Sequence, residues 1–145
     1  MYKHFLITTD RTGLSDRAIA DGMELAKALG ARVTVLTVIL PWIGAELSLI
    51  TQAGSSASYD RIIDANVAKC LALAQAVAAK AGVACDTMAV RQDQAWRAIV
   101  ETAEVRRCDL IVMASHGYSG LGAVLLGSET QKVLAHVKMP VLVHR

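Results

Sequence analysis

The sequence predicts a doubly wound α/β domain with a five-stranded parallel sheet and helices on both faces. Short, unbroken apolar runs alternate with longer stretches in which apolar residues recur at helical spacing. The stretches between successive runs are long enough for right-handed crossovers between parallel strands. The composition agrees, since 54% of the 145 residues are hydrophobic but only 4% are aromatic, as in layered cores of Ala, Val, Leu and Ile. We expect one domain over residues 1–145.

The first part of the chain predicts a strand, a helix and a second strand. The apolar run at residues 5–9 predicts the first strand, which Asp10 ends. Gly13 and Ser15 predict a turn and an N-cap, and apolar residues at helical spacing continue to Leu29, where Gly30 ends the helix. The continuous apolar run at residues 33–40 predicts the second strand.

The rest of the chain continues this alternation after an irregular segment. Residues 41–58 mix apolar side chains with Gly and Ser, so this segment is either a lid or partner surface, or it packs back on its own domain. Residues 59–81 predict the longest helix, 85–91 the third strand, 95–106 the next helix and 110–114 the fourth strand. A last helix ends near residue 136, and residues 141–144 predict the last strand.

A glycine-rich stretch, DLIVMASHGYSGLGAVLLGSETQ at residues 109–131, follows the fourth strand into the last helix. Its four glycines leave backbone amides uncovered, and Ser128 and Gln131 predict an N-cap and a capping box. Bare amides beside a helix N-terminus are typical of an anion site, and phosphate is the expected anion. Neither the P-loop nor the dinucleotide fingerprint is present in this stretch.

The spacing of these residues resembles the signature of the universal stress protein A family, G-x-x-G, nine residues, then G-[ST]. In this chain it is Ala114-Ser115-His116-Gly117, residues 118–126, then Gly127-Ser128. Ala114 replaces the first glycine, and Tyr118 stands where the family often has a basic residue. The resemblance covers essentially the whole chain. It implies an adenine nucleotide alpha hydrolase-like fold with strand order 3-2-1-4-5, whose ligand crevice lies between the first and fourth strands.

The resemblance also implies a site for ATP, with Mg²⁺ to compensate the phosphate charge. Asp10, in the segment Thr9-Asp10, matches an aspartate that contacts the adenosine, and Val38 matches the position whose backbone pairs with the adenine edge. The phosphate side comprises Ala114, His116, Gly117, Gly127, Ser128 and Glu129. Structural roles stay open beside these: Asp10 as a turn residue, Val38 as a core valine, His116 as a water-facing turn residue and Ser128 as an N-cap.

Three features oppose tight ATP binding. No arginine or lysine lies between Ala114 and Glu129, the Glu129 carboxylate repels a phosphate placed near it, and Ala114 adds a methyl group. The sequence therefore leaves two main interpretations. One is an ATP-binding regulatory dimer of the stress response, and the alternative is a nucleotide-free dimeric interaction or scaffold module. An enzyme or electron-transfer subunit using the same crevice is a third, weaker interpretation.

Catalysis is not expected beyond slow ATP hydrolysis, because the chain has no G-x-S-x-G elbow, no paired carboxylates near the glycine-rich stretch apart from Asp10 and Glu129, and no cysteine–histidine pair expected to be adjacent. No metal site of the protein's own is predicted. The resemblance implies a homodimer through the edge strand, with Val141, Leu142 and Val143 at the interface. A monomer whose edge is guarded by Pro140 and Arg145 is the alternative.

Composition excludes several other classes of protein. The net charge of +2 comes from scattered residues, so we expect no nucleic-acid partner. Three widely spaced cysteines predict free, buried thiols rather than a redox or zinc motif. Polar residues interrupt the alanine-rich stretch at 65–81, and the N-terminus lacks the pattern of a signal peptide. We therefore expect a cytoplasmic protein without a membrane span.

Overall fold

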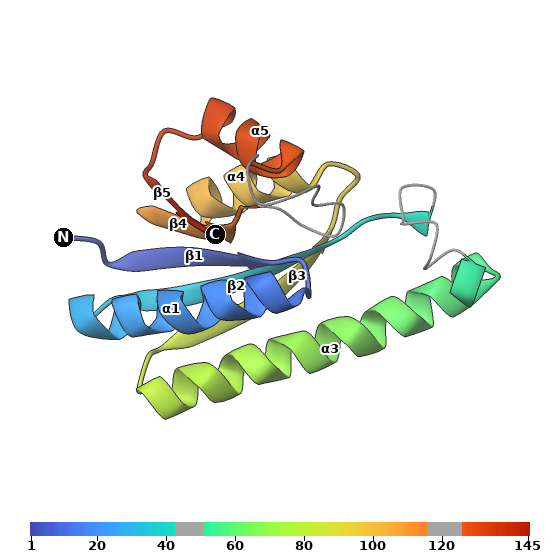
Figure 1. The fold of residues 1–145 in the computed structure, drawn as a ribbon, viewed down its shortest axis with the longest axis horizontal. Helices are drawn as coiled ribbons and strands as arrows, with labels where there is room; N and C mark the ends of the chain where they lie inside the picture. Colours follow the sequence, from blue (N-terminus) through green and yellow to red (C-terminus); the bar gives the residue numbers. More distant parts are fainter. Residues whose placement is uncertain (43–50, 116–125) are drawn as a thin grey trace.

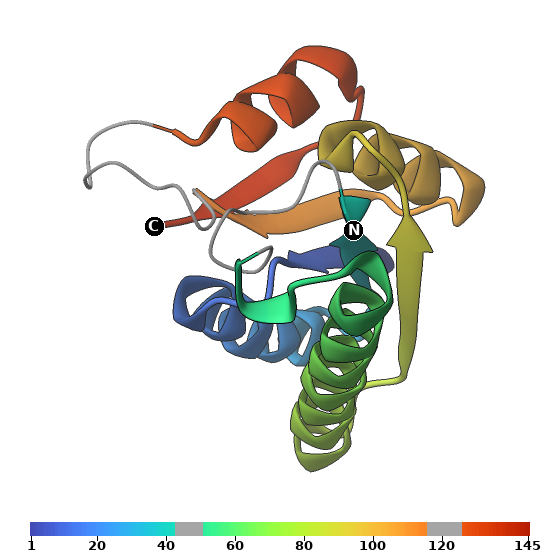
Figure 2. The same cartoon turned by 90° about the vertical axis from the view of Figure 1, so that its right-hand side faces the viewer.

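The computed structural model describes residues 1–42, 51–115 and 126–145. These residues contain one five-stranded parallel sheet with helices on both faces (Figures 1 and 2), which confirms the predicted fold class. The strands are β1 (His4–Thr9), β2 (Arg32–Ile39), β3 (Cys85–Arg91), β4 (Leu110–Ala114) and β5 (Val141–His144). The helices are α1 (Gly13–Leu29), α3 (Ser56–Ala81), α4 (Ala95–Val105) and α5 (Ser128–His136).

The strands lie in the order β3-β2-β1-β4-β5, as predicted, so the direction of winding reverses between β1 and β4. Thr9 at the end of β1 is in register with Thr37 of β2. On the other side Ile7 is in register with Val112 of β4, so Thr9 lies level with Ala114 two residues further on. The carboxyl ends of β2, β1 and β4 therefore meet at one edge of the sheet.

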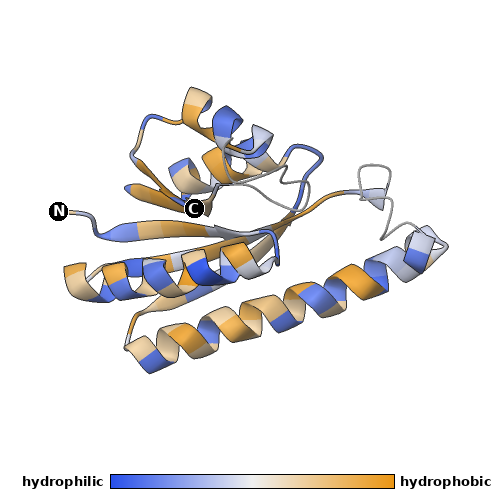
Figure 3. Cartoon of the chain, viewed as in Figure 1, coloured by the Kyte–Doolittle hydropathy of each residue, from blue (hydrophilic) through white to orange (hydrophobic). Residues whose placement is uncertain are grey.

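The two faces of the sheet bury different sets of strand side chains. Phe5, Ile7 and Val35 pack with α1 and α3, whereas Leu6 and Ile111 pack with α4 and α5. These strand residues are at most 1% exposed. Figure 1 shows the two helical layers on opposite sides of the strands. Because successive side chains alternate between faces, strands covered on both sides are rich in apolar residues, and Figure 3 shows these hydrophobic segments at the centre of the sheet.

Helix α3 is long and apolar enough, by length and composition alone, to meet the criteria for a membrane-spanning helix, the only such helix in the described ranges. Its buried residues recur every three or four positions, as expected of a helix that lays one face on a core: Tyr59, Ile63, Val67, Cys70, Ala74 and Ala78. Leu73 and Val77 lie on the outer side, 53% and 36% exposed. The buried stripe accounts for α3 as a core helix of the sheet.

Several predicted boundaries are confirmed and others are wrong by a few residues. β3, β4 and β5 have the predicted bounds, and Gly30 ends α1 in the left-handed region at φ +63°. The predicted N-cap Ser15 is wrong, because Thr12 caps α1 and Ser15 closes the capping box. α3 begins three residues early because Ser55 accepts a hydrogen bond from Ser58 N at 3.2 Å.

Smaller differences concern the other elements. β1 and β2 each begin one residue before the predicted start, and β2 ends at Ile39 rather than at residue 40. α4 ends at Val105, with Arg106 as its C-cap. Part of the segment at 41–58 packs back on its own domain, because the Trp42 ring lies edge-on against Tyr59 at a centroid distance of 5.4 Å. Residues 43–50 of that segment lie outside the described residues.

Candidate functional site

The turn between β1 and α1 forms one wall of the predicted crevice. The buried Thr9 hydroxyl lies 3.0 Å from Ser15 Oγ and accepts a hydrogen bond from Arg11 N at 3.0 Å. Asp10 Oδ1 accepts hydrogen bonds from Thr12 N at 3.1 Å and from the Thr12 hydroxyl at 2.6 Å. Asp10 therefore performs the structural role of a turn residue, and both of these hydrogen bonds use the same carboxylate oxygen.

The side chain of Arg11 extends from this turn across the end of β2. Its Nη1 atom donates hydrogen bonds to the Thr37 hydroxyl and, at 3.4 Å, to the Val38 carbonyl oxygen. The half-buried Val38 side chain packs against the core cluster on the α4 and α5 face. The Val38 backbone and the turn after β1 are thus in contact through Arg11. Sequence reasoning missed Arg11, although it directly follows the predicted site residue Asp10.

The two ends of the glycine-rich stretch lie together at the carboxyl end of β4. Gly127 N donates to the Ser115 carbonyl at 2.6 Å, and the buried Thr130 hydroxyl donates to the Ala114 carbonyl at 3.1 Å. We call these two ends, Ala114-Ser115 and residues 127–130, the stem. Ser115 N in turn donates to the His144 carbonyl at 2.7 Å, which joins the stem to β5. The stem therefore lies next to Thr9 and Asp10, because β4 is the neighbour of β1.

Two other predicted site residues, His116 and Gly117, lie outside the described residues, as do Tyr118, Gly120 and Gly122. The amide of Gly127, expected to be open to a phosphate, is occupied by the Ser115 carbonyl. The amides of the next residues, Ser128 and Glu129, belong to the first turn of α5 and have no acceptor within their own helix. They are the groups in the described stem that remain suited to an anion.

The predicted cap of α5 is wrong in its details. Gly127 is the N-cap, at φ −60° and ψ 154°, and Ser128 is the first residue of the helix. Gln131 does not close a capping box, because its side-chain amide donates to the Leu126 carbonyl at 2.7 Å. Ser128 is exposed and makes no capping hydrogen bond, so its hydroxyl lies at the helix N-terminus without that structural role.

Glu129 caps a helix other than its own. Its Oε2 atom accepts a hydrogen bond from Trp96 N at 2.8 Å, and its Oε1 atom lies 3.4 Å from Lys132 Nζ. Gln94, the N-cap of α4, makes no capping hydrogen bond with its side chain, so the carboxylate from α5 supplies the missing acceptor. Glu129 also lies in the first turn of its own helix α5, where a negative charge complements the helix dipole. Its charge is shared between α4 and a lysine.

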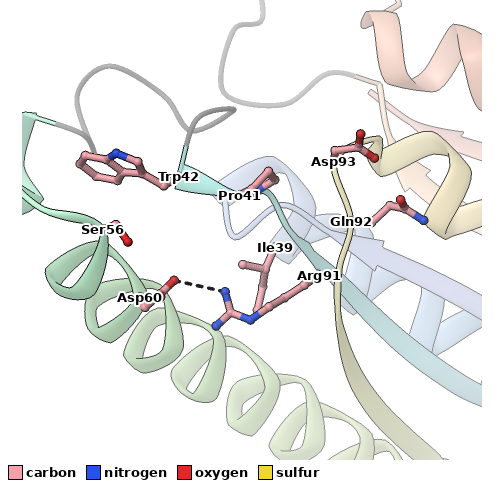
Figure 4. Close-up of a pocket in the computed structure, with 8 residues that line it drawn as sticks. All are labelled: Ile39, Pro41, Trp42, Ser56, Asp60, Arg91, Gln92 and Asp93. Carbon is pink, nitrogen blue, oxygen red and sulfur yellow. Dashed lines mark hydrogen bonds and ion pairs between the residues drawn. The ribbon is translucent and has the colours of Figure 1, made fainter.

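A cavity of about 430 Å³ lies on the other side of β2, at the carboxyl ends of β2 and β3 (Figure 4). Arg91 lines this cavity, and its positive charge is paired with two aspartates. Its Nη1 atom lies 3.3 Å from Asp60 Oδ1, and its Nη2 atom lies 2.8 Å from Asp64 Oδ1. The Tyr59 hydroxyl donates to the Leu40 carbonyl at 2.7 Å near this cavity, and burial raises the pKa of that phenol. The residues lining the cavity are Ile39, Pro41, Trp42, Ser56, Asp60, Arg91, Gln92 and Asp93.

Sequence reasoning did not find this cavity. The sequence features that could have indicated it are an arginine at the end of β3 and two aspartates one turn apart on α3. No neighbouring residue in the sequence shows that these charges pair. The pairing depends on α3 lying along β3. With two aspartates to one arginine, this region does not favour a phosphate.

In the part of the chain that the structure describes, thiols and possible metal ligands do not form a second reactive site. Cys70, Cys85 and Cys108 are free, as expected, and Cys70 and Cys108 are buried. Burial, reinforced by a neighbouring aspartate, raises the pKa of Cys85 and of Cys108 to about 11, so these thiols are unreactive near neutral pH. No group of three His, Cys, Asp or Glu side chains in the described parts of the chain is arranged to hold a metal ion.

The sheet order and this edge define a doubly wound α/β domain of the class that holds its ligand outside the carboxyl ends of the strands. The chain belongs to the Universal stress protein family, whose sequence pattern matches residues 1–145. It is 30% identical over 145 residues to universal stress protein MJ0531 of Methanocaldococcus jannaschii, covering 99% of this chain and 82% of that protein.

Solved structures agree with this membership. The fold is similar to that of universal stress protein UspA from Lactobacillus plantarum, with a TM-score of 0.78, 22% identity and coverage of 99% and 98% of the two chains. It is also similar to a universal stress protein solved in complex with cAMP, with a TM-score of 0.70, 25% identity and coverage of 99% and 97%.

Proposed function

We propose that this universal stress protein binds an adenine nucleotide, ATP carried with Mg²⁺, in the crevice at the carboxyl ends of β2, β1 and β4. The observation that carries the proposal is the adjacency of Asp10 to the Ala114-Ser115 stem, which leads to the N-terminus of α5. A universal stress protein 25% identical to this chain has been solved in complex with cAMP, which supports an adenine nucleotide as the ligand class.

The proposed contacts divide the crevice into a base side and a phosphate side. Thr9, Asp10 and the Val38 backbone form the base and ribose side, where Asp10 still has a second carboxylate oxygen to offer. On the phosphate side, the Ser128 hydroxyl and the first amides of α5 supply donors, together with His116 and Gly117. Mg²⁺ arrives with the phosphates, because the described residues offer no three-ligand group of their own.

We assign this binding a regulatory role in a cytoplasmic homodimer, with a bound conformation rather than a product as the output. The proposed interface is the free edge of β5, with Val141, Leu142 and Val143. Leu142 is 43% exposed in the single chain, and β5 pairs with β4 on its other edge.

Light scattering should show the mass of a dimer for the parent protein and the mass of a monomer for Leu142→Lys. A monomeric parent protein would contradict the interface.

Isothermal titration with ATP and Mg²⁺ tests the nucleotide site directly. Gly127→Glu places a carboxylate at the N-cap of α5, and the φ of −60° at this position tolerates a side chain. We expect micromolar binding in the parent protein and at least about a tenfold loss in Gly127→Glu, because like charges repel at this short distance. Gly127→Ser is the matched control, since serine is small, neutral and a good N-cap.

Absence of binding by a folded parent protein would overturn the proposal. The nucleotide-free dimeric interaction module would then be the supported function. One observation favours that alternative: Gly127 N, Asp10 Oδ1 and the Val38 carbonyl all have partners within the chain.

A further inference from the structure

Arg11 occupies an unusual position in the backbone. Its φ is +69°, in the left-handed region, and Arg107 is the only other non-glycine residue with a positive φ in the described ranges. An arginine at such a position costs free energy that glycine would not, so a side chain with a specific task is a common reason for it. The turn is held in place from both sides, by the Thr9 hydroxyl on Arg11 N and by Asp10 on Thr12.

Within the described ranges, the partners of the Arg11 guanidinium are neutral. It is half-buried and donates to the Thr37 hydroxyl and the Val38 carbonyl, and no carboxylate in the described residues lies within 4.0 Å of it. Arg91, on the far side of β2, is by contrast paired with two aspartates. The end of β2 therefore holds a positive charge that no carboxylate of the described residues neutralises.

A guanidinium is a donor-only group whose planar N–H atoms match the oxygens of a phosphate. The stretch from Ala114 to Glu129, proposed above to hold the phosphates, contains no arginine or lysine. Arg11 follows β1, and β4, which leads into that stretch, is the next strand. Neighbouring strands lie only about 4.8 Å apart, so the long side chain can turn from the β2 side to the phosphate side.

We propose that Arg11 determines that the crevice takes phosphorylated nucleotides in preference to nucleosides. In the ligand-free chain the guanidinium of Arg11 is hydrogen-bonded to Thr37 and Val38. A base that enters beside Val38 displaces it, and a phosphate on the same ligand then gives the displaced charge an anionic partner. This inference rests on the proposed function, because it assigns a selectivity to the same crevice.

The test compares AMP with adenosine by isothermal titration, so that only the phosphate differs between the ligands. Arg11→Gly removes the side chain and suits the positive φ, so misfolding is not expected. Arg11→Lys keeps the charge without the planar fork, and Arg107→Gly is the same substitution at the other left-handed arginine. In the parent protein we expect AMP to bind more tightly than adenosine by about tenfold or more, the usual strength of a charged hydrogen bond.

In Arg11→Gly this ratio should fall about tenfold, through weaker AMP binding and stronger adenosine binding. Arg11→Lys should keep part of the ratio, and Arg107→Gly should keep all of it. An unchanged ratio in Arg11→Gly, with both ligands still bound, would overturn the role of Arg11 and leave the nucleotide site intact. If neither ligand nor ATP binds to any folded variant, the proposed function fails, and this inference fails with it.

Discussion

The two ends of the sheet hold their polar side chains in different ways. At the amino end, Asp109 accepts hydrogen bonds from Lys3 N at 2.7 Å and His4 N at 3.0 Å, more than 100 residues away along the chain. At the carboxyl end, Asp10 bonds to Thr12, only two residues away. One aspartate therefore joins β1 to the segment before β4, whereas the other shapes only a local turn.

The histidine and arginine residues show the same difference. At the amino end His4 is 5% exposed, and its Nε2 atom lies 2.8 Å from the hydroxyl of Thr34 on the neighbouring strand β2. At the carboxyl end Arg11 is half-buried, and its hydrogen-bond partners among the described residues are neutral groups of β2. The buried, long-range contacts at the amino end contribute to folding. The local turn contacts of Asp10 and the half-buried contacts of Arg11 can be exchanged for contacts with a ligand while the fold stays intact.

The largest expected effect tests the two aspartates against each other. Asp109→Ala should lower the free energy of unfolding by about 3 kcal/mol, because two backbone donors lose a charged acceptor. Asp10→Ala should cost only about 1 kcal/mol, as expected for a local turn or cap. Urea denaturation measures both, and Asp109→Asn, which keeps one acceptor oxygen, should be intermediate. Equal losses for Asp10→Ala and Asp109→Ala would contradict the comparison.

The next largest effect is the pH dependence of folding stability that arises from His4 at the amino end. Burial, and then the nearby positive charge of Arg32, lower the pKa of His4 below 6.5. The unfolded chain therefore binds a proton that the folded chain does not, so stability falls as the pH decreases below about 6.5. The contribution of His4 to this slope is at most about 1.4 kcal/mol per pH unit.

His4→Gln should flatten this slope, because glutamine keeps a side-chain amide for Thr34 but does not titrate. Urea denaturation at several pH values between 5 and 8 measures the difference. A parent protein whose stability changes with pH just as in His4→Gln would show that protonation of His4 does not contribute.

The smallest effect concerns the two left-handed arginines, one at each end of the sheet. Arg107 follows α4, and its N–H donates to the Glu104 carbonyl at 3.0 Å, so glycine suits this helix end. Arg107→Gly should therefore raise the free energy of unfolding by up to about 1 kcal/mol. Arg11→Gly should change it by nearly zero, because the lost hydrogen bond to Thr37 offsets the released strain.

Thermal unfolding of both glycine variants and the parent protein makes this comparison. A large loss of stability in Arg11→Gly would mean that Arg11 is a structural residue of the kind found at the amino end. Its contacts with Thr37 and Val38 would then not be exchangeable for contacts with a ligand.

The strand ends that meet at the candidate site were predictable, but the hydrogen bonds there were not. The predicted strand order brings Asp10 and Ala114 to one edge of the sheet, and the structure has that order. Ser128 was a reasonable N-cap from local preference, yet Gly127 holds that position, since its carbonyl accepts the first helical hydrogen bond from Gln131 N. The bond from Gly127 N to the Ser115 carbonyl joins the two ends of the glycine-rich stretch and has no local signature.

Local signals along the chain were enough to identify the segments that become strands and helices. Apolar periodicity, the left-handed glycine that ends α1 and the apolar run of β4 act within a few residues, so they can be seen along the chain. Three other contacts follow from the packing of distant segments: Glu129 caps α4, Asp109 holds β1, and Arg11 reaches Val38. Each of these contacts joins segments that become neighbours when the sheet is ordered, since a side chain bonds to whatever group the fold brings within about 3 Å of it.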